Sequence, residues 1–185
     1  MRTDRIHGDG AARRLSCKAT VLHSGAARRT EDAMTTTTNL LDALPAGGRE
    51  RLTAIAHEVS LPRDARIFEE GRRADRFWII RSGQVTLDQH VPGRRAAVVE
   101  TLGRDDLLGW SWLFPPYLWH LGAETVGTVE AVEFDATVVR ALCEDDPVLG
   151  RAVYRYVAET VADRLQRTRV RLLDLYGPQG SGLEP

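Results

Sequence analysis

The spacing of apolar and polar positions changes character along the chain. Residues 1–38 are polar, rich in Arg, Thr, Gly and Ala, and have no sustained apolar period. This predicts a disordered N-terminal extension. Apolar residues then fall three and four positions apart, at Leu52, Ile55, Ala56 and Val59. That spacing predicts one amphipathic helix that ends before Pro62.

The middle of the chain is punctuated by glycines at intervals of 6 to 12 residues: Gly71, Gly83, Gly93, Gly103 and Gly109. Segments rich in β-branched and aromatic residues lie among or after them, at 77–80, 84–88, 96–100 and 129–135. Pro92-Gly93 is typical of a hairpin turn. Short strands at such regular spacing predict an antiparallel sandwich or barrel.

Helical patterning returns near the C-terminal end. Asp135 is placed to cap a short helix that runs through Leu142. Asp146-Pro147 combines a capping carboxylate with proline at the first helical position, so it predicts the start of a second helix. This long helix should run over 146–177, where Gly177-Pro178 stops it.

The long helix carries a second, narrower apolar pattern. Its members alternate by four and three positions: Tyr154, Ala158, Val161, Leu165, Thr168, Leu172 and Leu175. This is the seam of a two-stranded coiled coil, and it favours a parallel homodimer. The alternative is a helix that packs on its own barrel.

Composition narrows the function classes. The 185 residues carry a formal net charge of −1, which argues against nucleic-acid binding driven by bulk charge. No run approaches the roughly 20 apolar residues of a membrane helix. Cys17 and Cys143 lie far apart, which suits a reducing cytoplasm and supplies no metal cluster.

Three parts are therefore expected. Residues 1–38 form the extension, residues 39–177 form one folded domain that includes the helix, and residues 178–185 form a flexible tail. Met34, followed by four threonines, is a second plausible translation start.

Several motifs then occur in an order typical of one family: Arg66–Gly71 (RIFEEG), Asp75–Val85 (DRFWIIRSGQV), Leu102–Gly109 (LGRDDLLG) and Arg164–Thr168 (RLQRT). The chain resembles the effector domain of the Crp/Fnr family over Leu40 to Gly177. The resemblance implies a mainly β fold with flanking helices: the double-stranded β-helix, or jelly roll, of cyclic-nucleotide-binding domains, followed by a long dimer helix. It also implies a cyclic nucleotide such as cAMP, or another small effector.

The family's pocket uses a Gly, a Glu just after it for the ribose, and an Arg for the cyclic phosphate. Gly109 is in place, but Trp110 replaces the Glu. The Arg position falls between Trp119 and Gly122, and no Lys or Arg occurs from Asp105 to Val139. Each unpaired ligand group costs about 1–3 kcal/mol. We therefore expect weak or absent cAMP binding.

An aromatic segment occupies this region instead, since residues 109–120 hold five of the chain's twelve aromatic side chains. These aromatics either fill the emptied pocket or line a different ligand site or a partner surface. The candidate ligand-binding residues are Gly109, Trp110, Ser111, Trp112, Tyr117, Trp119, His120 and, on the dimer helix, Thr168. His57 is expected on a helix, His90 near a turn, and Cys143 buried and inert. The C-terminal arginines are expected on a solvated helix face: Arg151, Arg155, Arg164, Arg167, Arg169 and Arg171.

Three functions compete. The first is a cytoplasmic regulatory sensor domain that does not bind DNA, since residues 178–185 are too short for a helix-turn-helix domain. The second is a dimeric interaction module that docks on a partner protein. The third, a metal-dependent cupin-type enzyme, lacks the close histidine pair that such enzymes use. No catalytic or metal-ligating residue is therefore expected.

Overall fold

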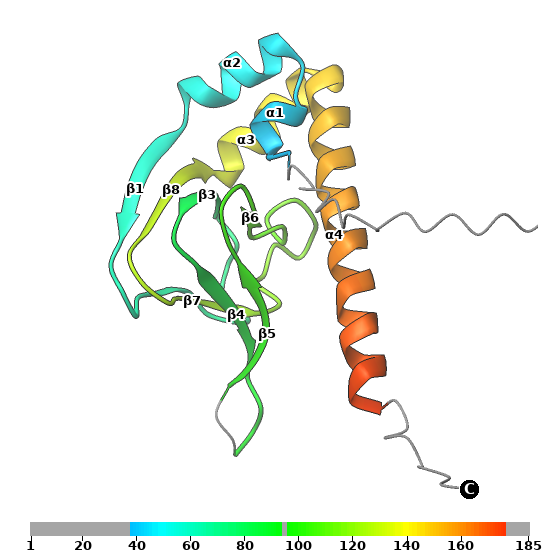
Figure 1. Ribbon diagram of the computed structural model, residues 1–185. Helices are drawn as coiled ribbons and strands as arrows, with labels where there is room; N and C mark the ends of the chain where they lie inside the picture. Colours follow the sequence, from blue (N-terminus) through cyan, green and yellow to red (C-terminus); the bar gives the residue numbers. More distant parts are fainter. Residues whose placement is uncertain (1–37, 94–95, 177–185) are drawn as a thin grey trace, which may run out of the picture. The chain divides into compact units, whose positions relative to one another are not determined.

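The computed structural model describes residues 38–93 and 96–176 (Figure 1). Apart from Thr38, the predicted extension lies outside these residues, as does the predicted tail. Two short helices come first, α1 (Leu40–Ala43) and α2 (Ala46–Ala54). Eight strands follow: β1 (His57–Leu61), β2 (Arg66–Phe68), β3 (Arg76–Ser82), β4 (Val85–Gln89), β5 (Ala97–Leu102), β6 (Leu107–Leu108), β7 (Gly122–Thr125) and β8 (Val129–Asp135). Two helices end the described chain, α3 (Ala136–Asp145) and α4 (Pro147–Tyr176).

The strands form two four-stranded antiparallel sheets within the described residues. Their orders are β1-β8-β3-β6 and β2-β7-β4-β5. Both sheets contribute to one hydrophobic core, with Phe77 and Ile79 from the first and Val85 and Leu87 from the second. The predicted all-antiparallel sandwich or barrel is therefore confirmed.

The prediction of one helix up to Pro62 is wrong. Helix α2 ends at Ala54, and His57–Leu61 is strand β1, so His57 does not lie on a helix. Strand β1 pairs with β8, and Val59 lies opposite Ala131. In HEVSL, polar and apolar residues alternate from Glu58 onward, and the ladder with β8 selects this period of two over the helical one.

Helices α3 and α4 begin where the sequence predicts. The Asp135 carboxylate accepts hydrogen bonds from the amides of Thr137 and Val138 and caps α3. The Asp146 carboxylate accepts from Val148 and Leu149 at 3.0 and 3.1 Å and caps α4. Helix α3 continues to Asp145, three residues beyond the predicted end.

Helix α4 joins the core along one stripe of its surface. Leu149, Val153 and Val157 recur every four residues and are at most 1% exposed. Beyond them the helix follows the domain past β5, as Figure 1 shows. None of the described helices is both long enough and apolar enough to cross a bilayer.

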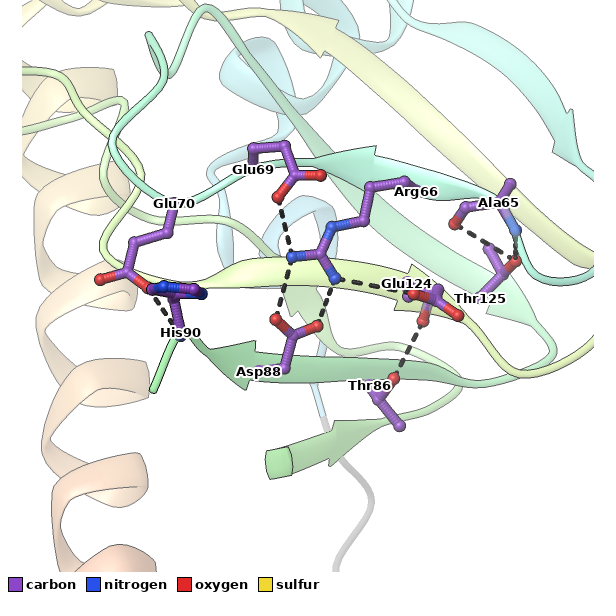
Figure 2. Close-up of polar contacts among 9 residues, drawn as sticks. All are labelled: Ala65, Arg66, Glu69, Glu70, Thr86, Asp88, His90, Glu124 and Thr125. Carbon is purple, nitrogen blue, oxygen red and sulfur yellow. Dashed lines mark hydrogen bonds and ion pairs between the residues drawn. The ribbon is translucent and has the colours of Figure 1, made fainter. Parts of the chain in front are cut away.

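An ion pair between Arg66 and the buried Asp88 ties strands of the second sheet together (Figure 2). The Arg66 guanidinium on β2 donates two hydrogen bonds to the Asp88 carboxylate on β4, one of them 2.9 Å long. It also donates to Glu69 and lies 3.7 Å from Glu124 on β7. Asp88 foremost, and Glu69 after it, raise the pKa of Arg66. A Cβ at Gly122 would collide with the guanidinium, so a larger residue there would displace Arg66 from this position.

Candidate functional site

The site begins where strand β6 ends. Gly109 follows Leu108 directly and has a φ of +86°, a conformation that disfavours L side chains. A Cβ on residue 109 would lie 2.7 Å from the indole ring of Trp119. Glycine therefore permits both the turn of the backbone and the close approach of Trp119.

Trp119 fills the space beside Gly109. Its amide donates to the carbonyl of Arg72, and its carbonyl accepts from the amide of Gly71, both at 2.8 Å. These backbone bonds aim the ring inward, where it stacks on Phe68 with 3.9 Å between ring centroids. Trp119 is only 4% exposed. Trp119 is therefore a buried, packed aromatic residue beside Gly109.

Trp112 and Tyr117 lie outside the cavity although the sequence grouped them with it. Trp112 is fully buried in the core, where it stacks on Phe77 at 4.3 Å. Arg140 on α3 donates to the Trp112 carbonyl at 2.7 Å. The same guanidinium lies over the ring of Tyr117, 4.6 Å from its centroid. These two aromatics therefore anchor the segment rather than line a ligand site.

Trp110, Ser111 and His120 form one side of the cavity. The rings of Trp110 and His120 are stacked with centroids 5.1 Å apart. The Ser111 hydroxyl lies 3.0 Å from Nδ1 of His120, in a hydrogen bond whose direction the imidazole tautomer sets. Ser111 is buried, whereas Trp110 is half-buried and His120 is exposed. These three predicted residues are brought together as expected.

The cavity itself is small. Its lining is mostly apolar and consists of Phe68, Leu87, Gly109, Trp110, Ser111, Trp119, His120, Leu121 and Arg164. About 40 Å³ is open to water-sized groups. Small-molecule sites usually span roughly 300–1,000 Å³. With Trp119 in this position, the cavity has no room for a whole nucleotide.

The cation at the cavity was missed by sequence reasoning. Arg164 was expected on a solvated face, but it is 8% exposed and lines the cavity. Its Nη2 donates to the Leu107 carbonyl at 2.5 Å. Burial lowers the pKa of Arg164, while Glu100 opposes that effect. The signal was available, because Arg164 lies seven residues after Val157 on the same helix stripe.

Thr168 lies one turn beyond Arg164 and outside the cavity. Its hydroxyl donates to the Arg164 carbonyl at 2.8 Å, and its side chain is exposed. Two further arginines lie on this part of α4. Arg167 pairs with Glu100 at 3.3 Å, and Arg171 donates to the Val99 carbonyl at 2.8 Å. Arg164, Arg167 and Arg171 thus tie the helix to β6 of the first sheet and β5 of the second.

Cys143 and His90 lie apart from the cavity. Cys143 is buried at the packed side of α3, and burial raises the pKa of its thiol to about 11. The amide of His90 donates to the Glu70 carboxylate at 2.9 Å, just before the hairpin turn. Within residues 38–93 and 96–176, no three His, Cys, Asp or Glu side chains are grouped as metal ligands.

The fold and the pocket position can now be compared with known proteins. The family model of the cyclic nucleotide-binding domain matches residues 58–146. The CRP-like cAMP-activated global transcriptional regulator of Mycobacterium tuberculosis is 32% identical over 124 residues. That match covers 67% of this chain and 54% of the relative. This chain carries a cyclic nucleotide-binding domain of the Crp/Fnr type.

Solved structures agree. The N-terminal domain of a transcriptional regulator from Streptomyces coelicolor A3(2) is 26% identical, with a TM-score of 0.56. That match covers 78% of this chain and 96% of the other. A cyclic nucleotide-binding domain from Methylobacillus flagellatus shares the fold at 14% identity, with a TM-score of 0.66 and coverage of 75% and 81%. The predicted jelly roll with flanking helices is confirmed.

The curated relative is longer than this chain, which spans about half its length. Trp110 follows Gly109 directly in this chain. Among the described residues that line the cavity, the one arginine is Arg164 on α4.

Proposed function

We propose that this chain is a regulatory Crp-type domain that binds cAMP weakly or not at all. The observation that carries the proposal is the position of Trp119. Its ring lies against Gly109 and Phe68, where a family ligand would need open space. Only about 40 Å³ remains beside it.

The missing polar contacts support the same conclusion. With Trp110 in place of the Glu, no carboxylate follows Gly109 to accept from a ribose hydroxyl. A buried ligand group left without its partner costs about 1–3 kcal/mol. Two such losses correspond to several factors of ten in affinity, because about 1.4 kcal/mol is tenfold.

The exposed apolar residues of helix α4 favour a homodimer, which would form through this helix. Tyr154, Leu165 and Leu172 are 45%, 48% and 52% exposed, although they are large and apolar. They lie on a different helix face from Leu149, Val153 and Val157, which pack on the domain. A second copy of α4, in the parallel pairing that the seam predicts, would bury them.

A dimeric interaction module is the second candidate, since the same apolar face of α4 is also open to a partner protein. The two candidates differ in one respect, because a sensor must respond to a ligand in the cavity. Absence of direct DNA binding, absence of enzymatic activity, and a cytoplasmic location stay predictions.

Thermal unfolding with and without millimolar cAMP and cGMP tests the proposal. A ligand present at 100 times its Kd stabilises the folded state by about 2.7 kcal/mol. The proposal expects an unchanged midpoint with both nucleotides. A clear rise with either one would mean that Trp119 moves and that the pocket supplies new phosphate contacts.

A further inference from the structure

The wall of the small cavity carries one formal charge among its lining residues, that of Arg164. The remaining lining is apolar or aromatic except for Ser111 and His120. The Arg164 side chain is nine-tenths buried, with 10% of its surface exposed. An ion this deeply buried needs close partners to offset the water it has lost.

The partners of Arg164 in the domain are incomplete. Nη2 has the Leu107 carbonyl, but the buried Nε has no hydrogen-bond partner among the described residues. The nearest carboxylate oxygen, on Glu100, lies 3.6 Å from Nε. Glu100 also pairs with Arg167, so its charge is shared between two guanidinium groups. Asp106 contributes a further, longer-range attraction.

The lining of the cavity also offers complementary polar groups. The Ser111 hydroxyl and the His120 imidazole are hydrogen-bonded to each other and line the same space as Arg164. With a neutral imidazole their mutual hydrogen bond uses one proton and leaves one donor for an anion, either the Ser111 O–H or the His120 Nε2–H, depending on the tautomer. Phe68, Leu87 and Trp119 keep the rest of the wall apolar. Low polarity strengthens a charged hydrogen bond.

We propose that this cavity binds a small anion, a carboxylate or oxyanion of a few heavy atoms, through Arg164. The volume sets the size of the ligand. At roughly 10–15 Å³ for each water-sized centre, 40 Å³ holds about three such groups. The inference rests on the proposed function, because it takes the same cavity as the sensor site. In this inference the residue that binds the anion, Arg164, belongs to helix α4. An anion in the cavity would therefore act directly on the helix that carries the exposed apolar face.

Nuclear magnetic resonance of the tryptophan indoles tests this directly. The chain has four tryptophans, and two of them, Trp110 and Trp119, line the cavity. Titration with sodium acetate or inorganic phosphate, at constant ionic strength with chloride as the balancing ion, should shift these two signals saturably. The indole of Trp112, which stacks on Phe77 in the core, should not move. Non-saturable shifts, or equal shifts with chloride, would overturn the proposal.

Matched variants locate the charge. Arg164→Gln should weaken anion binding at least tenfold, whereas Arg167→Gln should leave it within about twofold. Arg167 is the control because it also contacts Glu100 but does not line the cavity. Should Arg164→Gln fail to fold, Arg164→Lys serves instead, because it keeps the charge and loses the guanidinium fork. Unchanged affinity in that variant would overturn the proposal.

The result is separable from that of the proposed function. A protein that binds cAMP but neither acetate nor phosphate contradicts both statements. A protein that binds neither the nucleotide nor the anions contradicts only the anion site. Saturable anion binding without any response to cAMP is the outcome expected from the two together.

Discussion

Gly109 and Trp119 are matched so closely that a single added carbon would bring them into collision. The position of a Cβ on residue 109 lies 2.7 Å from two atoms of the indole ring. In the Crp-type pocket this glycine allows the backbone to approach a ligand. In this chain the Trp119 ring lies directly against this glycine.

The first prediction concerns this contact. Gly109→Ala should destabilise the fold by about 1–3 kcal/mol from overpacking, in addition to the cost of a positive φ. Gly93→Ala is the control, because Gly93 also has a positive φ of +73° and a Cβ there meets nothing within 4 Å. Chemical denaturation of both variants measures the difference. Equal losses would mean that Trp119 yields easily and that the pocket is not firmly closed.

The second prediction concerns the Arg66–Asp88 ion pair in the second sheet. Arg66→Ala leaves the Asp88 carboxylate, 8% exposed in its side chain, without its guanidinium partner. Because the Arg66 side chain is itself 29% exposed, the cost should be that of one unsatisfied buried group, about 1–3 kcal/mol, and not that of a fully buried pair. The free energy of unfolding in urea should fall by an amount of this order.

A surface pair provides the control for that measurement. Arg155 and Glu159 are bonded at 2.8 Å on the exposed side of α4. Arg155→Ala should leave the denaturation midpoint almost unchanged. A similar small effect of Arg66→Ala would show that Asp88 finds other partners.

Much of the fold could be predicted because its signals are local. Asp135 and Asp146 each cap a helix that begins at the following residue, as their side-chain chemistry indicates. Strand β1 was missed because its register is set by β8, more than 60 residues away. A short segment with both periods cannot be assigned without that distant partner.

The site was predicted less completely for a related reason. Trp110, Ser111, Trp119 and His120 are close in sequence and do meet at the cavity. Arg164, which lies 44 residues after His120 in the sequence, also lines the cavity. The burial of Arg164 depends on how α4 packs against β6. Trp112 and Thr168 have side chains of suitable chemistry, but these side chains do not line the cavity. Only the tertiary structure determines where they lie.

The third prediction concerns the dimer. Leu172→Glu places a charge on the predicted seam and should shift the protein from dimer to monomer in sedimentation equilibrium. Leu173→Glu is the control, because Leu173 is more exposed, at 69%, and lies off the seam. The seam assignment fails if both variants remain dimeric or if Leu173→Glu alone dissociates.

The fourth prediction concerns pH. Backbone hydrogen bonds, that from Leu149 first, hold the pKa of Asp146 below its usual value. A lowered folded pKa stabilises the protein above the ordinary carboxylate pKa, and this stabilisation is lost as pH falls through the folded pKa. Asp146→Ala should therefore lower the thermal midpoint at neutral pH, and its deficit should shrink in acid. Asp146→Asn, which also caps a helix, should lose less. A deficit that stays constant with pH would contradict the role of the charge.

The fifth prediction follows from the closed pocket. Calorimetric titration of the native protein with cAMP measures the interaction without any variant. Trp119 beside Gly109 and the absent phosphate partner predict no saturable heat, which corresponds to a Kd weaker than about 1 mM, or less than about 4.1 kcal/mol of binding free energy. A saturable isotherm with a micromolar Kd would contradict the account, because the cavity would then have to open and admit the whole nucleotide.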